Sequence, residues 1–454
     1  MESFKSAVAA LAIAALIAAA PISRAASAAA YGITSWVAPK AYLNMPRHAE
    51  GATLPALLSQ TGAFADLARL VPASGLIPYE LIVPFWSDGA AKSRYVALPK
   101  GTQIGFTPDG EWSFPEGTVF VKTFELPTDE AHPQVRRRLE TRLLVRDDRG
   151  GMYGVDYKWR PDNSDADLLP GSVTENIAIR ARDGSTHEQT WYYPSRDNCL
   201  TCHNARAGLV LGLKTRQLNR TLTYPTGVTD NELRTLNHLQ LLKPAVPDAA
   251  LTTLPTLAAA TDTARSLEDR ARSYLDANCA HCHRPGGTVA YFDARYSTPL
   301  AKQELIDGPI LINEGIDRPH VISPHDTWRS IAYMRANTNG DIRMPPLARE
   351  TVDVGGMQLL HDWIISMPGK DVLVPPTITP DGGTFAAALS VTLSSPDPGA
   401  QIHYTVDGSV PGPEDPVYSD PLKITGPTVV RARAYRDGMT RSITSESVFI
   451  VGQQ

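Results

Sequence analysis

The sequence predicts a multidomain α+β protein with a β-rich N-terminal domain at 31–190, a mainly α-helical region at 191–368 and a C-terminal Ig-like β-sandwich at 377–452. Three observations lead to this prediction. Short strand-like runs between turn residues dominate the first part, and leucines at helical spacing occur in the second. In the third part, two-residue alternation is interrupted by regular Gly and Pro turns.

The N-terminus is typical of a secretory signal. Lys5 precedes an apolar run, Ala7 to Ala20, and Ala26-Ser27-Ala28 offers small residues for cleavage. The run is shorter than the ~20 apolar residues that a membrane-spanning helix needs. We therefore expect a signal peptide at 1–28, a periplasmic or extracellular (secreted) mature protein, and no transmembrane segment after cleavage.

The chain is mildly acidic. Its formal net charge is −5 at pH 7, and removing the signal, which contains Glu2, Lys5 and Arg24, brings the charge to −6. This balance favours solubility and excludes a broad nucleic-acid-binding role, so we expect partners to recognise local patches.

The N-terminal domain contains two clear strand patterns. Val119 to Phe124 and Arg138 to Val145 are rich in strand-forming residues and are bounded by Pro, Gly and Asp clusters. Leu54 to Leu70 carries leucines at helical spacing, which predicts a helix there.

The central region contains three helical patterns, at Asn231 to Leu242, Ser266 to Asn278 and Val354 to Ile365. Acidic residues near the start of the second pattern are typical of a helix N-terminus.

A linker and a small β domain complete the chain. Residues 369–376 include Val374-Pro375-Pro376, which predicts a stiff linker. Ser390 to Ser394 and Thr428 to Tyr435 alternate in period two, which predicts strands of a β-sandwich.

All four cysteines belong to two Cys-x-x-Cys-His motifs. The cysteines and histidines of these motifs are Cys199, Cys202, His203, Cys279, Cys282 and His283. The pattern is the attachment signature of covalently bound haem, in which two thioethers hold the porphyrin and the histidine ligates iron. We expect two haem c groups, with His203 and His283 as iron ligands. The segments concerned are 191–250 for the first haem and 266–368 for the second.

Zinc and disulfides are the alternatives for these cysteines. A four-cysteine zinc site usually has its two pairs ~15–20 residues apart, whereas Cys202 and Cys279 lie much further apart in the sequence. Two structural disulfides are conceivable in an exported protein, but Cys-x-x-Cys bridges are usually redox-active. Haem explains the histidine after each pair, and neither alternative does.

Met344 is the expected sixth ligand of the second haem. It lies in Arg343-Met344-Pro345-Pro346, downstream of His283. A methionine thioether is a soft iron ligand that raises the reduction potential, and the prolines restrict the loop that carries it. For the first haem the sequence leaves the sixth ligand open. The candidates are His238, Met334, His187 and Met45, or a site open to small ligands.

Around the second motif the chain resembles a known domain. Asn278 to Gly287, Met344 to Leu347, Val352-Asp353 and Trp363-Ile364 resemble the class I cytochrome c domain of bacterial exported haem proteins. This resemblance implies a cytochrome c-like fold for the dihaem region.

A wider resemblance covers about residues 54–368. Trp86 to Ala90, Glu140 to Arg142 and Leu211 to Asn219 are similar to a little-characterised family of dihaem proteins in which a β-rich half precedes two haem motifs. It implies haem binding and electron transfer and gives no substrate. The stretch Ile402 to Pro411 resembles the β-sandwich appended to chitobiases and other glycoside hydrolases.

Three functions remain open. The first is an exported dihaem c-type cytochrome that transfers electrons between redox partner proteins, with a His/Met-ligated second haem. The second is a dihaem enzyme of the peroxidase or oxidase type with a catalytic first haem. The third is a haem-containing surface-binding protein that contacts polysaccharide or protein through 377–452. We expect electron transfer rather than catalysis, and no catalytic residue is assigned.

Overall fold

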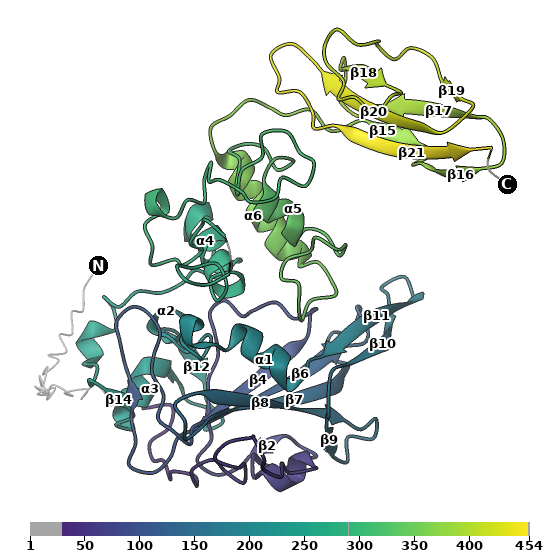
Figure 1. Cartoon of the computed structure of the whole chain (residues 1–454). Helices are drawn as coiled ribbons and strands as arrows, with labels where there is room; N and C mark the ends of the chain where they lie inside the picture. Colours follow the sequence, from purple (N-terminus) through teal and green to yellow (C-terminus); the bar gives the residue numbers. More distant parts are fainter. Residues whose placement is uncertain (1–29, 289, 453–454) are drawn as a thin grey trace, which may run out of the picture.

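The computed structural model describes residues 30–288 and 290–452 (Figure 1). The predicted signal peptide at 1–28 lies outside the described residues. Within the described part of the chain, no helix is long and apolar enough to cross a membrane.

A six-stranded antiparallel sheet organises the N-terminal half, in the order β3-β4-β6-β7-β8-β9. Its strands are β3 (Ile77–Pro78), β4 (Ala91–Ala97), β6 (Val119–Pro127), β7 (Arg136–Arg146), β8 (Met152–Trp159) and β9 (Ala166–Leu168). Strands β6 and β7 confirm the two predicted strand patterns, and they lie at the centre of the sheet because their residues are apolar enough to be covered on both faces.

The predicted helix at Leu54 to Leu70 is wrong. Only a 3-10 turn forms, η1 (Leu58–Thr61), and Gly62 ends it with φ 77°. The chain then enters β1 (Phe64–Asp66), which pairs with β2 (Val71–Pro72). Glycine in the left-handed conformation terminates a helix, so the leucine spacing here reflects packing of a turn rather than of a helix.

The two faces of the six-stranded sheet have separate cores. One face packs residues such as Val121, Leu143 and Tyr157 against the N-terminal segment. On the other face, Val96 and Phe120 share a core with residues from the segment that follows the first motif, which are Val210, Leu213, Leu218, Leu233, Leu236, Leu241, Leu242 and Val246. The first motif is therefore built onto the sheet (Figure 1).

Smaller strand pairs surround this sheet. They are β10 (Val173–Arg180) with β11 (Thr186–Tyr193), β12 (Thr221–Thr223) with β13 (Thr229–Asn231), and β5 (Ile104–Gly105) with β14 (Leu242–Lys243).

The expectation of a mainly α-helical, cytochrome c-like region at 191–368 is wrong. Its helices are α1 (Arg196–Cys202), α2 (Thr215–Leu218), α3 (Glu232–His238), α4 (Leu267–Asn278), α5 (Ile331–Ala336) and α6 (Val354–Ser366). Only α4 and α6 exceed seven residues among the described helices. These two confirm the predicted helices at 266–278 and 354–365, and α3 is shorter than predicted.

Left-handed turns explain the low helix content of this region. Non-glycine residues with positive φ interrupt it repeatedly, at Leu209, Gln240, Glu304, Asp307, Glu314, Arg318, His325 and Ala348. Each such residue reverses the chain and ends regular hydrogen bonding. The long connections pack around α4 and α6 through a core that includes Tyr274, Leu360 and Trp363.

The C-terminal module is the predicted β-sandwich. One sheet contains β15 (Thr377–Thr379), β17 (Leu389–Ser394) and β19 (Leu422–Ile424); the other contains β16 (Gly383–Phe385), β21 (Ser445–Val451), β20 (Thr428–Tyr435) and β18 (Gln401–Thr405). Alternating side chains such as Val391, Val430 and Phe449 fill the space between the sheets.

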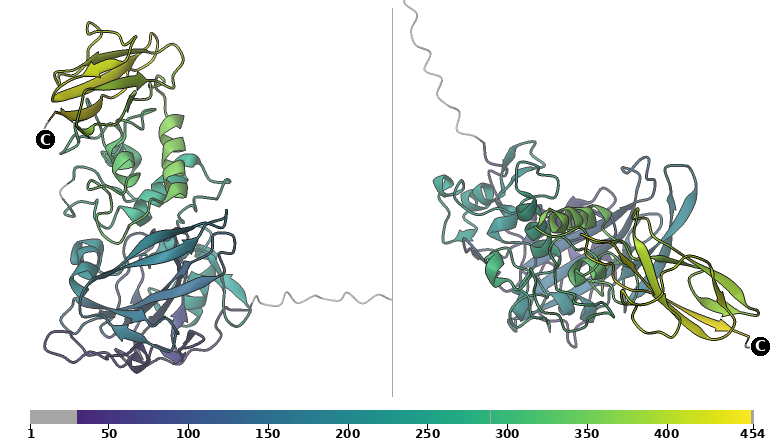
Figure 2. Two further views of the ribbon diagram at one scale, coloured as in Figure 1. Left: turned by 90° about the vertical axis from the view of Figure 1, so that its right-hand side faces the viewer. Right: turned by 90° about the horizontal axis from the view of Figure 1, so that it is seen from above.

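The module lies at one end of the molecule, and the region of α4, α5 and α6 separates it from the six-stranded sheet (Figures 1 and 2). An ion cluster fixes it there. Asp317 pairs with Arg329 at 3.1 Å, and with Arg433 and Arg441 of the module at 3.3 and 3.0 Å.

Candidate functional site

The first motif lies on a short, well-capped helix. Ser195 is the N-cap of α1, where its side chain accepts from the backbone N–H of Asn198 and forms a capping box with it. Cys199 and Cys202 are three residues apart on α1, so both thiols project from one face of the helix. Both line the same cavity.

Gly154 allows α1 to lie close to the sheet. A Cβ at this position of β8 would be 2.8 Å from both Cβ and Sγ of Cys199 and 3.0 Å from Leu144. Glycine inside a strand is otherwise unfavourable, and here it marks a close approach of another segment.

His203 is oriented as an iron ligand would be. Its Nδ1 lies 2.8 Å from the backbone oxygen of Leu209, a residue in the left-handed conformation. A neutral ring that donates from Nδ1 leaves Nε2 unprotonated and able to coordinate a metal. Burial lowers the pKa of His203 to about 4, so the ring is neutral near pH 7.

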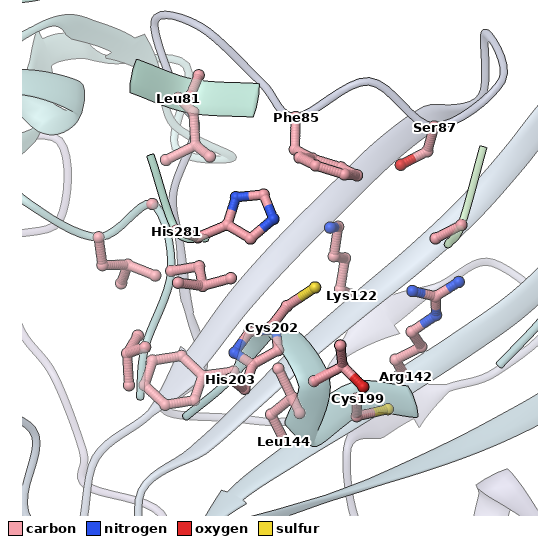
Figure 3. Close-up of a pocket in the computed structure, with 18 of the residues that line it drawn as sticks. Leu81, Phe85, Ser87, Lys122, Arg142, Leu144, Cys199, Cys202, His203 and His281 are labelled. Atoms are coloured by element: carbon pink, nitrogen blue, oxygen red, sulfur yellow. The ribbon is translucent and has the colours of Figure 1, made fainter. Parts of the chain in front are cut away.

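The cavity holds about 210 Å³ of space between the sheet and the second motif (Figure 3). The sheet contributes Lys122, Arg142 and Leu144, and the first motif contributes its two cysteines and His203. The second motif contributes His281 and Cys282, and residues 345–348 are also part of the lining.

The two motifs meet at this cavity. The Cys202 and Cys282 side chains hydrogen bond, and this contact lowers the pKa of the Cys282 thiol. Nearby, Arg284 pairs with Glu111 at 2.8 Å, and this pair joins the second motif to the N-terminal half.

The second motif follows α4 directly. Cys279 is the C-cap of this helix and is partly buried against the core around α4 and α6. The His283 ring stacks on Phe292 with 4.3 Å between ring centres, and its buried Nδ1 has no hydrogen-bond partner among the residues that the structure describes. Burial lowers the pKa of His283 to about 4.

Met344 lies on a loop close to this motif. Its backbone N–H donates to the carbonyl of Arg335 at 2.8 Å, and the charge of Arg335 acts on His283. The next four residues, 345–348, line the cavity at which the two motifs meet.

The residues that the sequence offers as the sixth ligand of the first haem lie away from the cavity. His238 stacks on Tyr31 with 3.7 Å between ring centres, and Met45 is in the core on the opposite face of the sheet. His187 lies 3.9 Å from Glu130 on the β10–β11 hairpin, and Met334 does not line the cavity.

Sequence reasoning missed three potential ligands that line the cavity: His281, Met152 and the amine of Lys122. His281 lies inside the second motif, in which the expected iron ligand is His283. Met152 and Lys122 lie on strands, and only the pairing register places them on the cavity face.

The zinc and disulfide alternatives gain no support. Among the residues described, no three His, Cys, Asp or Glu side chains are grouped so as to hold a metal ion. No disulfide joins any of the four cysteines, all of which lie in the described part of the chain.

Residues 380–446 match a family model described as the chitobiase/beta-hexosaminidase C-terminal domain. No curated protein and no solved structure matches the chain. Two expectations are corrected by these findings. The assignment to a dihaem cytochrome family is wrong, because the matched family is that of the C-terminal module and the rest of the chain gives no cytochrome signal. The description as a haem- and iron-binding cytochrome c is also corrected, because the matched family is that of the C-terminal module and the described residues contain no group of three His, Cys, Asp or Glu side chains that could hold a metal ion.

Proposed function

We propose that this chain is an exported protein that binds two haems covalently, one at each Cys-x-x-Cys-His motif, and transfers electrons through them. The observation that carries the proposal is the convergence of both motifs on one cavity, with all three attachment residues of the first motif in its lining. Thioether attachment needs two thiols and one imidazole, and it does not require a preassembled cluster of ionisable ligands.

The residues of the first motif fit this cofactor. Cys199 and Cys202 supply the two thiols from one helix face, and Gly154 leaves room for them above the sheet. His203 supplies a neutral imidazole whose Nδ1 is held by the carbonyl of Leu209. When bound, haem supplies a one-electron redox centre whose potential depends on its axial ligands, on burial and on nearby charge.

His281 is the proposed sixth ligand of the first haem. It lines the cavity together with His203, and its ring lies edge-on to Phe85 with 5.5 Å between ring centres (Figure 3). The His281 side chain is already buried, so folding has restricted its rotamers before any ligand binds. Ligation would therefore cost little additional side-chain entropy.

The second haem is assigned to Cys279, Cys282 and His283, with Met344 as the sixth ligand. The His283 ring is partly buried and stacks on Phe292, and this burial keeps it neutral near pH 7, as an imidazole ligand has to be. The loop that carries Met344 is anchored next to the motif by its bond to Arg335.

Contact between the motifs supports electron transfer as the function. Cys202 and Cys282 hydrogen bond, so groups attached to them would lie close together. A short separation suits exchange of single electrons between two centres and between this protein and its redox partners.

Carbon monoxide binding tests electron transfer against small-molecule catalysis. The mature protein would be purified after co-production with the machinery for covalent haem attachment, reduced, and titrated with carbon monoxide. We expect no stoichiometric binding, because His281 and Met344 would occupy the positions that carbon monoxide needs. Stoichiometric binding at both irons would contradict electron transfer, and binding at one iron with turnover of hydrogen peroxide would favour a dihaem enzyme.

The C-terminal module supports a further, separate contact. Its family match is to a domain named for chitobiase and beta-hexosaminidase, which is compatible with contact to a polysaccharide in the periplasm or outside the cell. Retention of the full chain on chitin or cellulose would support this role. Equal flow-through of the protein on both matrices would count against it.

A further inference from the structure

A row of three cations crosses neighbouring strands on the cavity face of the sheet. Arg94 of β4 lies opposite Lys122 of β6, and Lys122 lies opposite Arg142 of β7. All three line the cavity. Like charges directly opposite one another destabilise a sheet, so the fold alone disfavours this arrangement.

Arg142 is the only member of the row with a close ion pair among the described residues. Its Nε and Nη2 donate to Glu140 at 3.1 and 2.5 Å. Arg94 donates to the backbone oxygen of Lys92 at 3.4 Å, and Glu80 and Glu232 act on its charge without a direct ion pair among the described residues.

Lys122 has neither a hydrogen bond nor an ion pair within the described part of the chain. Its Nζ lies 4.8 Å from the centre of the Phe124 ring, and Arg142 lies 4.5 Å from the same ring. Cation–π contacts contribute only about 0.5–2 kcal/mol. Burial, followed by repulsion from Arg94, Lys92 and Arg142, holds the pKa of Lys122 well below its ordinary value.

The neighbouring row of the same face is apolar. Val96 lies opposite Phe120, Phe120 lies opposite Leu144, and Leu144 lies opposite Gly154. One step along the strands therefore changes the surface from apolar to cationic. Such a surface suits a ligand with an apolar body and an anionic edge.

We propose that the row Arg94–Lys122–Arg142 is a carboxylate-binding site of the cavity. The carboxylates have two sources with the same chemistry. One is the propionate edge of a haem attached at the first motif, an assignment that rests on the proposed function. The other is a free small carboxylate that enters the cavity beside the first motif.

Thermal unfolding in sodium propionate, against sodium chloride at equal ionic strength, tests the site. It would be measured on the full-length haem-loaded protein and on the variant Cys199→Ser/Cys202→Ser, which cannot attach the first haem. A ligand that binds only the folded state raises the melting temperature, and the increase grows with the ratio of its concentration to its dissociation constant. We expect propionate to raise the melting temperature of the variant.

Comparison of the two proteins separates the sources. If propionate acts on the variant alone, the haem carboxylates occupy the row in the loaded protein. If it acts on both proteins, the row takes a free carboxylate. The proposal is overturned if propionate and chloride have the same effect on both proteins. Attachment itself is checked independently by mass, so this failure differs from failure of the proposed function.

Substitutions of Lys122 identify the site. Lys122→Met is expected to abolish the propionate effect while raising the melting temperature without propionate, because it removes a buried amine that has no hydrogen-bond partner among the described residues. Lys122→Arg keeps the charge and should keep the effect. Lys100→Met removes a cation from an exposed turn and serves as the control.

A second measurement uses the loaded protein alone. Loss of a cation beside the first haem should lower the midpoint potential of that haem in Lys122→Met but not in Lys100→Met. Equal potentials in both variants, together with an unchanged propionate response, would exclude Lys122 from the site.

Discussion

The imidazole of His281 links the two motifs at the scale of single residues. It belongs to the second motif in sequence, but it lines the cavity that contains the first. The same position inside a Cys-x-x-Cys-His motif usually serves only as a spacer, and here it offers a nitrogen ligand.

Replacement of His281 by alanine should leave one of the two irons without its sixth protein ligand. We expect electron paramagnetic resonance of the oxidised protein to show one high-spin and one low-spin haem. His238→Ala, on a ring stacked on Tyr31 away from the cavity, should leave the spectrum unchanged. An unchanged spectrum in His281→Ala would assign the ligand to another group.

Met344 is tested through the near-infrared band of sulfur-to-iron charge transfer. Met344→Ala should abolish this band and lower the potential of the second haem, because a thioether ligand favours the reduced iron. Met334→Ala is the matched control on the neighbouring helix α5. Persistence of the band in Met344→Ala would place the sulfur ligand elsewhere.

The sequence identifies the proposed attachment residues but not the residues that surround them in the cavity. Because the Cys-x-x-Cys-His motif occurs twice, Cys199 and His203 can be selected as candidate haem-binding residues from the sequence alone. Lys122 and Arg142 could not be assigned, because their place in the cavity depends on strand register and on folding of the motif onto the sheet. Charged residues at inward-facing positions of an apolar strand, such as Lys122 between Val121 and Thr123, are the signal that could have found them.

Helix α1 and strand β8 form the support of the first motif at the scale of elements. Their close approach depends on Gly154, since the side chain of any other residue would collide with Cys199. The helix itself is short and is held by its cap and by this contact rather than by its length.

Gly154→Ala should therefore prevent attachment at the first motif and spare the second. Overpacking at this contact should also cost about 1–3 kcal/mol of stability. The masses of fragments that carry each motif report attachment directly. Gly171→Ala, where a new Cβ meets nothing within 4 Å, is the control. Normal attachment at both motifs in Gly154→Ala would contradict this role for the glycine.

Elements were predicted best where one pattern dominated over a sufficient length. The strands β6 and β7 and the helices α4 and α6 were found because their apolar periodicity is continuous. The helical character of the central region was overestimated, because single left-handed residues such as Leu209 and Ala348 divide it, and their conformation leaves no periodic signal.

Asp317 joins the module to the rest of the chain at the scale of the whole molecule. Three arginines surround its carboxylate, and Arg329 and Arg433 are almost fully buried. Without the carboxylate, these buried cations would lose the anion that they share. The loss would weaken the contact between the module and the rest of the chain.

Asp317→Asn should lower the free energy of unfolding by about 1–3 kcal/mol, as expected when a partly exposed member of a buried charge cluster is neutralised. Urea unfolding measures this change. Asp437→Asn makes the same substitution at an exposed position of the module and should have little effect. Equal stability of the two variants would show that the module is held by other contacts.

The molecule as a whole combines a sheet, two attachment motifs and a terminal module in a fixed arrangement. The contact of Cys202 with Cys282 brings together residues that are eighty positions apart in the sequence, and it underlies the proposed transfer of electrons between two centres. This proposal depends first on the cofactors being present at both motifs.

Mass spectrometry of the mature exported protein tests that requirement directly. After proteolysis, the fragment that contains Cys199 and Cys202 and the fragment that contains Cys279 and Cys282 should each carry the mass of one haem. Fragments of unmodified mass at both motifs would contradict the account.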